Sequence, residues 1–313
     1  ASDAFLRKCD ASGNEIWTRQ FGTTGDDAAR GVAVQGSAGY VVGYTHGTFS
    51  GQTNAGGQDA FVRKYDSDGN EVWTRQFGTS ADDSAVAAAA EDQTGGLYVA
   101  GMTAGALDGQ ISAGDRDSFV RKYDAGGTAV LTRQFGTSGT EGTYGVAVYR
   151  NAAQGWSEVY VAGYTTGHFP DATDFGLTDT YVRKYKFLDN WTEALGTPWT
   201  RQFGSGFNEQ AFAVAADASG AWVAGDVRGA ISDSFYTGTW IGDRDAYVRK
   251  YSPTGTVLYT HQFGTTAYDA VVGIALVGSD IFVTGYTVGG LQGANQGGHD
   301  VFVRRYVYAS GTW

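Results

Sequence analysis

The sequence predicts an all-β protein, a β-propeller of four-stranded antiparallel blades. One strand, D-x-[FY]-[VL]-R-[KR]-[YC], recurs six times, and its copies occupy residues 3–9, 59–65, 117–123, 179–185, 245–251 and 300–306. Three further short runs recur between these copies. The chain has 48 glycines but only 3 prolines, which indicates that the glycines lie in turns between strands. A period of 55 to 66 residues indicates a repeat architecture, and four strands per repeat are typical of a propeller blade.

The second run follows the first across a short turn. In the second repeat the turn is Ser-Asp-Gly-Asn at 67–70, and residues 71–77 (EVWTRQF) come next. Two alternating runs joined by a Gly/Asn/Asp turn predict a hairpin. The run recurs with the sequence T-(R/H)-Q-F-G at 17–23, 73–79, 131–137, 199–205 and 259–265.

The third and fourth runs complete the blade. The third is rich in small residues, as in GVAV at 31–34, and the fourth resembles YVAGY at 160–164. Small side chains suit a crowded place, so we expect the third run to form the innermost strand, A. The fourth run is then strand B, the D-x-F-V-R-K-Y run is C, and the bulky W-T-R-Q-F run is the outer strand D. We further expect the Arg of strand C to stack on aromatic rings and to pair with the Asp that opens the strand.

The strand count leaves one strand over. Strands A and B occur five times and strand C six times, so five blades are countable with a spare C strand. The alternative is that the chain is part of a six- or seven-bladed propeller. The unbroken repeat predicts a single domain over residues 1–313. An unpaired strand invites pairing with a protein partner or with another copy of the chain.

Composition excludes several classes of protein. The net charge of −11 disfavours nucleic acid as a partner. No apolar run is long enough to insert into a membrane. The single cysteine, Cys9, stands where other copies have Tyr, and it excludes a disulfide network within the chain. The first residue is Ala1, which fits a processed, secreted protein or part of a longer one.

The motifs D-x-[FY]-V-[RK]-[KR]-Y, G-N-x-x-W-T-R-Q-F-G-T and Y-V-[AT]-G-Y-T resemble the SBBP repeat, a β-propeller repeat of bacterial extracellular and surface proteins. Residues 59–102 are the cleanest copy. The resemblance implies an extracellular or cell-surface location in a bacterium and a propeller that commonly has seven blades. It implies no catalytic residue.

Acidic residues recur in the linkers between strands D and A. They are Asp26, Asp27, Asp82, Asp83, Glu141, Glu209 and Asp269. Carboxylates and backbone carbonyls are the ligands that Ca²⁺ takes, so a divalent-cation site is one interpretation. The other is that each acid caps its own turn, as Asp commonly does in loops. Calcium is the one cofactor that the sequence suggests.

Aromatic residues in insertions that occur once form the second candidate site. They are Trp156, Trp191, Tyr236 and Trp240. Exposed aromatic rings can contact sugar rings or a protein partner, or they can fold back over their own blade.

Signals for catalysis are few. The four histidines are scattered, and no G-x-S-x-G, H-E-x-x-H or phosphate-loop motif occurs. The sequence therefore predicts a non-enzymatic extracellular propeller, a structural protein serving as a surface, adhesion or assembly module. A carbohydrate-binding propeller of lectin type is the alternative, and a carbohydrate-active hydrolase or lyase is the third hypothesis.

Overall fold

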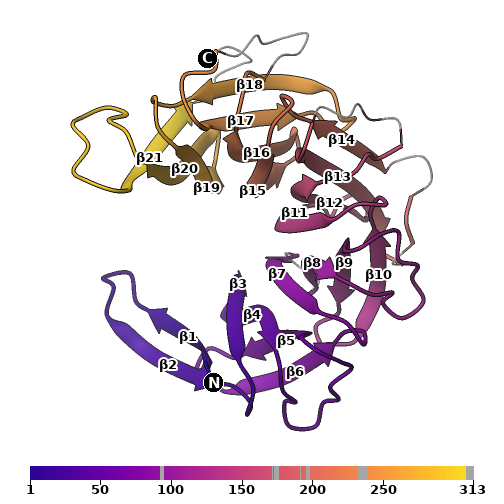
Figure 1. Ribbon diagram of the computed structural model, residues 1–313. Helices are drawn as coiled ribbons and strands as arrows, with labels where there is room; N and C mark the ends of the chain where they lie inside the picture. Colours follow the sequence, from indigo (N-terminus) through magenta and orange to yellow (C-terminus); the bar gives the residue numbers. More distant parts are fainter. Residues whose placement is uncertain are drawn as a thin grey trace. The chain divides into compact units, whose positions relative to one another are not determined.

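The structure is a computed structural model that describes residues 1–91, 95–170, 172, 176–190, 192–194, 198–231 and 239–307 (Figure 1). These residues form 21 strands and no helix, which confirms the all-β prediction. Within them there is accordingly no helix that could cross a membrane. The chain divides into two compact units, Ala1–Thr143 and Tyr144–Trp313. The predicted single domain over residues 1–313 stays a prediction.

The first unit holds three sheets. A two-stranded sheet pairs β1 (Ala4–Cys9) with β2 (Glu15–Phe21). The next sheet has the order β3 (Asp27–Gln35), β4 (Ala38–Thr45), β5 (Asp59–Tyr65) and β6 (Glu71–Phe77). The third has the order β7 (Asp83–Ala90), β8 (Leu97–Thr103), β9 (Asp117–Tyr123) and β10 (Ala129–Phe135).

The second unit also holds three sheets, the first of which starts just before the division. Its order is β11 (Glu141–Asn151), β12 (Trp156–Thr165), β13 (Asp179–Leu188) and β14 (Trp199–Phe203). The next has the order β15 (Glu209–Asp217), β16 (Gly220–Val227), β17 (Asp245–Tyr251) and β18 (Val257–Phe263). The last has three strands, β19 (Asp269–Val277), β20 (Asp280–Thr287) and β21 (Asp300–Val307).

The sheets are propeller blades with the strand order that the sequence predicts. In each complete sheet the strands follow A, B, C, D from one edge to the other. The pairing is antiparallel, as in the β3–β4, β4–β5 and β5–β6 ladders. The 21 described strands are compatible with five blades and one spare C strand.

The A strands need small residues because neighbouring sheets approach closely there. A Cβ atom at Gly31 of β3 would lie 2.7 Å from the Val86 carbonyl oxygen and 3.1 Å from the Ala87 Cα of β7. Each A strand with a complete ladder description also carries a register shift at the same place in the repeat. The shifts fall between Ala29 and Gly31, Ala85 and Ala87, Ala211 and Ala213, and Val271 and Gly273.

The C-strand Arg of β5, β9, β17 and β21 stacks on a ring of the preceding sheet, but the predicted pairing of Arg63 with Asp59 is wrong. The Arg63 guanidinium lies 4.5 Å from the Phe21 ring centroid, and its Nε donates to Thr74 Oγ1 at 2.8 Å. The Asp59 carboxylate accepts instead from Gln76 Nε2 at 2.8 Å. On the neighbouring D strand, Arg63 is thus held by the Thr74 hydroxyl and by the Glu71 carboxylate, 3.4 Å from Nη1, whereas Asp59 is held by the Gln76 amide.

The D strands β2, β6 and β14 each fasten their own sheet to the next one. Trp17 Nε1 donates to the Ser67 carbonyl at 3.0 Å, and Arg19 Nε donates to the Gly69 carbonyl at 2.7 Å. Gly69 has φ +78°, and a Cβ there would lie 2.8 Å from the Trp17 ring. The backbone conformation and the lack of space therefore both require glycine at this position. The same two bonds recur from Trp73 and Arg75, and from Trp199 and Arg201. We call this contact the D-strand latch.

The glycine of T-R-Q-F-G lies between two carboxylates. A Cβ atom at Gly78 would lie 2.5 Å from Asp59 Oδ1 and 2.7 Å from Asp83 Oδ2. The equivalent glycines meet the equivalent acids, at Gly22, Gly136, Gly204 and Gly264. We call each group of glycine and two acids a carboxylate junction.

Gly78→Ala is expected to lower the free energy of unfolding by about 1–3 kcal/mol, because the added methyl group must displace two buried carboxylates. Gly39→Ala is the matched control, since a Cβ there meets its nearest atom at 3.7 Å. Denaturant unfolding measures both variants, and equal effects would contradict the interpretation.

Candidate functional site

The acidic linkers between strands D and A contain two kinds of acid. Asp26 and Asp82 are exposed, and each holds the segment that precedes a C strand. Asp26 Oδ1 accepts from the backbone N–H of Ser2 at 2.7 Å, and Asp82 Oδ1 accepts from that of Gln58 at 3.0 Å. Both acids therefore serve as turn partners in the structure.

The acid that opens each A strand is buried and caps the linker. In every case its carboxylate accepts the backbone N–H of the residue four positions earlier, which is Thr23, Thr79, Thr137, Ser205 or Thr265. The caps are Asp27, Asp83, Glu141, Glu209 and Asp269, each at most 1% exposed. In the structure these five acids thus make the hydrogen bonds that the capping interpretation describes.

Each capping acid faces a second acid across the carboxylate junction. Burial raises the pKa of Asp83, and the charge of Asp59 adds to the shift. Burial likewise raises the pKa of Glu209, with Asp179 as the nearby charge. Among the described residues no three His, Cys, Asp or Glu side chains are grouped so as to hold a metal ion. Calcium binding by the predicted acids stays a prediction.

Of the aromatic candidates, Trp156 is covered by its own sheet. The Lys186 Nζ lies 3.9 Å from the Trp156 ring centroid, and the indole Nε1 donates to Gln154 Oε1 at 2.8 Å. The Tyr149 ring packs on it at a centroid distance of 5.9 Å. Trp191 and Tyr236 lie outside the described residues.

Trp240 forms an exposed aromatic platform with Phe207. The two rings stack with centroids 6.3 Å apart and an interplanar angle of 28°. Trp240 is 47% exposed and Phe207 46% exposed. Leu177 adjoins the pair, since its backbone N–H donates to the Phe207 carbonyl, and Ile241 follows Trp240 in the chain. We call these four exposed side chains the aromatic patch.

One exposed ion pair lies in the same linker as Trp240. Arg228 and Asp243 form an exposed ion pair with Nε and Oδ1 3.3 Å apart. Ser205, two residues before Phe207, donates its hydroxyl to the Arg228 carbonyl at 2.9 Å. The patch therefore combines ring faces with hydrogen-bonding groups of both charges.

A buried polar network that the sequence did not predict lies in the same repeat. The Asp226 carboxylate is fully buried, and its Oδ2 accepts from Arg244 Nη1 and from the Tyr268 hydroxyl, both at 2.8 Å. Burial raises the pKa of Asp226, although the Arg244 charge opposes the shift. Asp226 stands where other repeats have Tyr44, Met102 or Tyr164. Aligning the repeats with one another would therefore have identified Asp226 as an exceptional residue.

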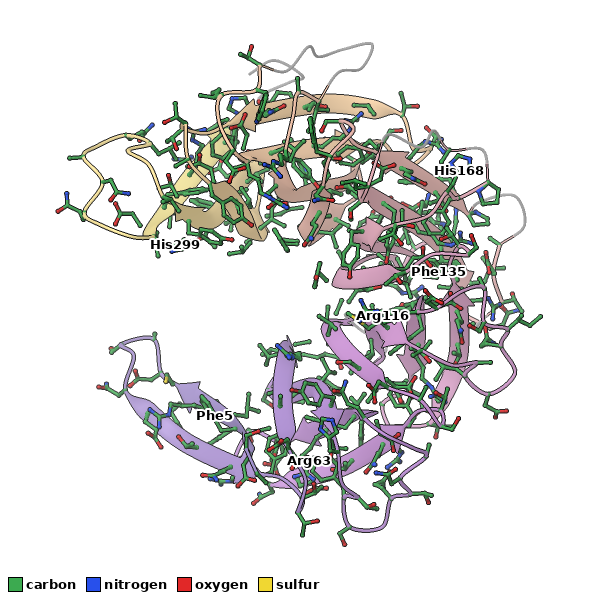
Figure 2. All side chains as sticks on the ribbon, viewed as in Figure 1. Phe5, Arg63, Arg116, Phe135, His168 and His299 are labelled. Carbon is green, nitrogen blue, oxygen red and sulfur yellow. The ribbon has the colours of Figure 1, made fainter. Side chains whose placement is uncertain are left out.

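The described histidines do not assemble a cluster. His261 contacts the Tyr306 hydroxyl at 3.0 Å, and His299 packs on the Tyr286 ring. Figure 2 shows His168 and His299 at separate places in the second unit. The structure therefore adds no histidine site to the candidates.

No family model matches the chain. The SBBP resemblance accordingly stays a prediction. The regulatory protein FlaEY of Caulobacter vibrioides is 26% identical over 163 residues, which cover 47% of this chain and 17% of that protein. The matched part is thus less than a fifth of that relative.

Among solved structures, a variant of the Synechocystis apocarotenoid oxygenase has a TM-score of 0.45 at 9% identity and covers 90% of this chain and 61% of that one. A GH43 β-1,3-galactosidase has a TM-score of 0.38 at 8% identity, covering 98% of both chains. The Trypanosoma rangeli sialidase has a TM-score of 0.36 at 10% identity, covering 97% of this chain and 57% of that one.

These comparisons overturn the predicted non-enzymatic surface, adhesion or assembly module. The similar structures are mostly enzymes. At 8–10% identity no catalytic residue is transferred to this chain.

The pH dependence of stability tests the carboxylate junction. The pKa of Asp83 is raised above its ordinary 3.8 in the folded chain, so the folded chain binds this proton more readily than the unfolded chain does. The contribution of Asp83 to the free energy of unfolding is therefore expected to grow as the pH falls from above the raised pKa toward 3.8. Asp83→Asn is expected to remove this gain, as measured by denaturant unfolding across that range.

Asp66→Asn is the control of opposite sign. Hydrogen bonds from Asn70 lower the pKa of Asp66, so its contribution to stability is lost as the pH falls. A pH dependence in the Asp83 variant equal to that of the native chain would contradict the junction's role.

Proposed function

We propose that the chain binds carbohydrate through the aromatic patch of the fourth repeat. The observation that carries the proposal is the stacked, exposed pair of Trp240 and Phe207. Aromatic rings offer a large apolar surface to the C–H face of a sugar ring, and burying that surface is favourable.

The polar groups beside the patch support a sugar ligand more than an apolar one. Arg228 and Asp243 are each about half exposed, and both belong to the linker that carries Trp240, so this linker offers a donor and an acceptor as well as a ring. Binding sites of this kind combine apolar walls with a few polar groups that fix orientation. Sugar hydroxyls both donate and accept hydrogen bonds, which matches an Arg–Asp pair.

The position of the patch also supports a unique binding site. Trp240 lies in the linker between β16 and β17, and Phe207 in the linker between β14 and β15. Neither side chain belongs to a motif shared by all repeats. A function of the whole scaffold would use positions that all repeats share. Recognition of one ligand requires a site that occurs only once, as this patch does. The proposal extends to an extracellular or cell-surface location, where polysaccharides are accessible.

Trp240→Ala is expected to weaken glycan binding at least tenfold, because the exposed ring face is lost while the blade core is untouched. A glycan array identifies the ligand, and calorimetry with that glycan gives the affinity. Ile111→Ala is the matched control, since Ile111 is an 86% exposed apolar residue in the corresponding linker of another repeat.

Two results would contradict the proposal. One is an array on which the native chain retains no glycan. The other is a bound glycan whose affinity is the same for the native chain and for Trp240→Ala, with both proteins giving the same near-ultraviolet circular dichroism.

A further inference from the structure

Three positions of the repeat meet beyond the end of strand B in the fourth repeat. The first is the last residue but one of strand B, the second directly precedes the Asp of strand C, and the third directly precedes the acid of the next strand A. Here they are Asp226, Arg244 and Tyr268, and both Arg244 and Tyr268 donate to Asp226 Oδ2 at 2.8 Å. An isolated bridge also pairs the backbones of Arg244 and Tyr268.

This combination of side chains departs from the other repeats. The first position holds Tyr44, Met102 or Tyr164 in the second, third and fourth complete sets of strands A and B that lack the aspartate. The third position holds Asp82, Thr140 or Asn208 where this set has Tyr268. The aspartate and the tyrosine thus occur together in one repeat, and both of them bind the same arginine.

Stability does not account for the departure. Asp226 is fully buried, and a buried carboxylate loses its hydration. Tyr44 and Tyr164 show that an aromatic side chain fits the same position without a charge. A buried ion pair contributes little net stability, because the loss of hydration offsets the attraction between the charges. What the pair does provide is a guanidinium group held in one place.

Arg244 is held through its side chain and through its backbone. The guanidinium lies 5.5 Å from the Tyr268 ring centroid, and its Nη1 donates to Asp226. The Arg244 carbonyl accepts the backbone N–H of Asp269 at 2.9 Å. Just before it, the backbone N–H of Ile241 donates to the Asp245 carboxylate at 3.1 Å. The position of this side chain is therefore set before any ligand arrives.

The other edge of the Arg244 guanidinium is available to a ligand. Nη1 makes its one hydrogen bond, whereas Nε and Nη2 make none with the described residues. The side chain is 21% exposed, and it has no buried nitrogen without a partner, unlike Arg116 at the same position of another repeat. Nε and Nη2 point two N–H groups in parallel, which is the arrangement that binds both oxygens of a carboxylate.

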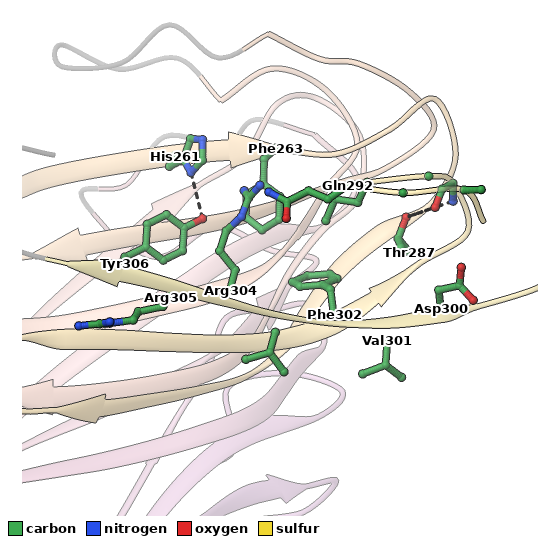
Figure 3. Close-up of a pocket in the computed structure, with 16 residues that line it drawn as sticks. His261, Phe263, Thr287, Gln292, Asp300, Val301, Phe302, Arg304, Arg305 and Tyr306 are labelled. Atoms are coloured by element: carbon green, nitrogen blue, oxygen red, sulfur yellow. Dashed lines mark hydrogen bonds between the residues drawn. The ribbon is translucent and has the colours of Figure 1, made fainter. Parts of the chain in front are cut away.

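Arg244 is not one of the arginines of the scaffold. The Arg of strand C belongs to the motif that all repeats share, and it stacks on a ring of the preceding sheet. Arg304 shows this contact, with its guanidinium 4.2 Å from the Phe263 ring centroid (Figure 3). Arg244 lies outside that motif, at a position where other repeats have Gln58 or Thr178.

Arg244 also lies close to the aromatic patch. It follows Trp240 by four residues in the same linker, so their Cα atoms are at most about 14 Å apart. A short oligosaccharide that stacks on Trp240 can span this distance. Asp243, the neighbouring acid in the chain, pairs with Arg228, so its charge is compensated.

We propose that Arg244 binds the carboxylate of an acidic sugar, which makes the site selective for acidic over neutral glycans. This selectivity rests on the carbohydrate binding proposed above, and it names the class of ligand. Asp226 and Tyr268 are positioning residues, because they hold one side of the guanidinium and leave the Nε–Nη2 edge to the ligand.

A glycan array printed with matched pairs tests the selectivity. Each pair is an oligosaccharide of glucuronic, galacturonic or mannuronic acid and its carboxyl-reduced form, which keeps the linkages but has no charge. The full 313-residue chain is expected to bind the acidic member of at least one pair about tenfold more tightly or better, because a charge-assisted bidentate contact is lost in the neutral member. Arg116→Ala is the control at the same position of another repeat and is expected to keep this preference.

Two variants test the residues. The double variant Asp226→Tyr with Arg244→Thr recreates the pair that Tyr164 and Thr178 form in another repeat, so no buried charge is left unpaired. It is expected to bind both members of each pair equally, with the affinity for the neutral member unchanged. Asp226→Asn is expected to reduce the preference for the acidic member, whereas a merely structural role would lower both affinities by the same factor.

The possible failures are distinguishable. Equal binding of the two members by the native chain would overturn the selectivity and leave carbohydrate binding at the aromatic patch standing. A preference that persists in the double variant would overturn the role of Arg244. An array on which the native chain retains no glycan would overturn both proposals.

Discussion

The carboxylate junction is the constraint on which the rest of each blade depends. At this point the ends of strands C, D and A meet, because Asp59 opens C, Gly78 follows D and Asp83 opens A. Both acids are buried: the Gln76 amide donates to Asp59 Oδ2 and the Thr79 N–H donates to Asp83 Oδ2, whereas Asp59 Oδ1 and Asp83 Oδ1 have no hydrogen-bond partner within the described residues. The need of buried carboxylates for donors accounts for the recurring Gln and Thr, and the close approach of both acids accounts for the recurring Gly.

Much of this fold could be predicted because the chain contains its own alignment. Recurring runs revealed strands, their order and the small residues of the A strand, where β3 and β7 approach closely. The partner of Asp59 could not be predicted, because recurrence shows that Arg63, Gln76 and Asp59 occur together without showing which atoms meet. Register decides that, and it pairs Arg63 with Thr74 and leaves Gln76 to reach Asp59.

The candidate site was only partly predictable for a related reason. Exposure of an aromatic residue in an insertion depends on what folds over it, and Lys186 covers Trp156 whereas Phe207 stacks beside an exposed Trp240. Asp226 was visible as a departure from the repeat, but only the fold brings Arg244 and Tyr268 to it. Residues that recur in every repeat therefore predict the fold well. The role of a residue that occurs in one repeat can be inferred only when its neighbours in the structure are known.

The D-strand latch joins only adjacent sheets, as when Arg19 of β2 reaches Gly69 between β5 and β6. Stability in such an arrangement is a sum of terms within sheets and terms between nearest neighbours. Within the first unit, the β3–β6 sheet makes a latch with the sheet on each side, whereas β1 adds a bond from Lys8 Nζ to the Ser67 carbonyl at 2.9 Å but no latch of its own. Amide hydrogen exchange should accordingly be slowest in β4 and β5 and fastest in β1, so that opening of the chain begins at a strand rather than with the loss of a whole blade.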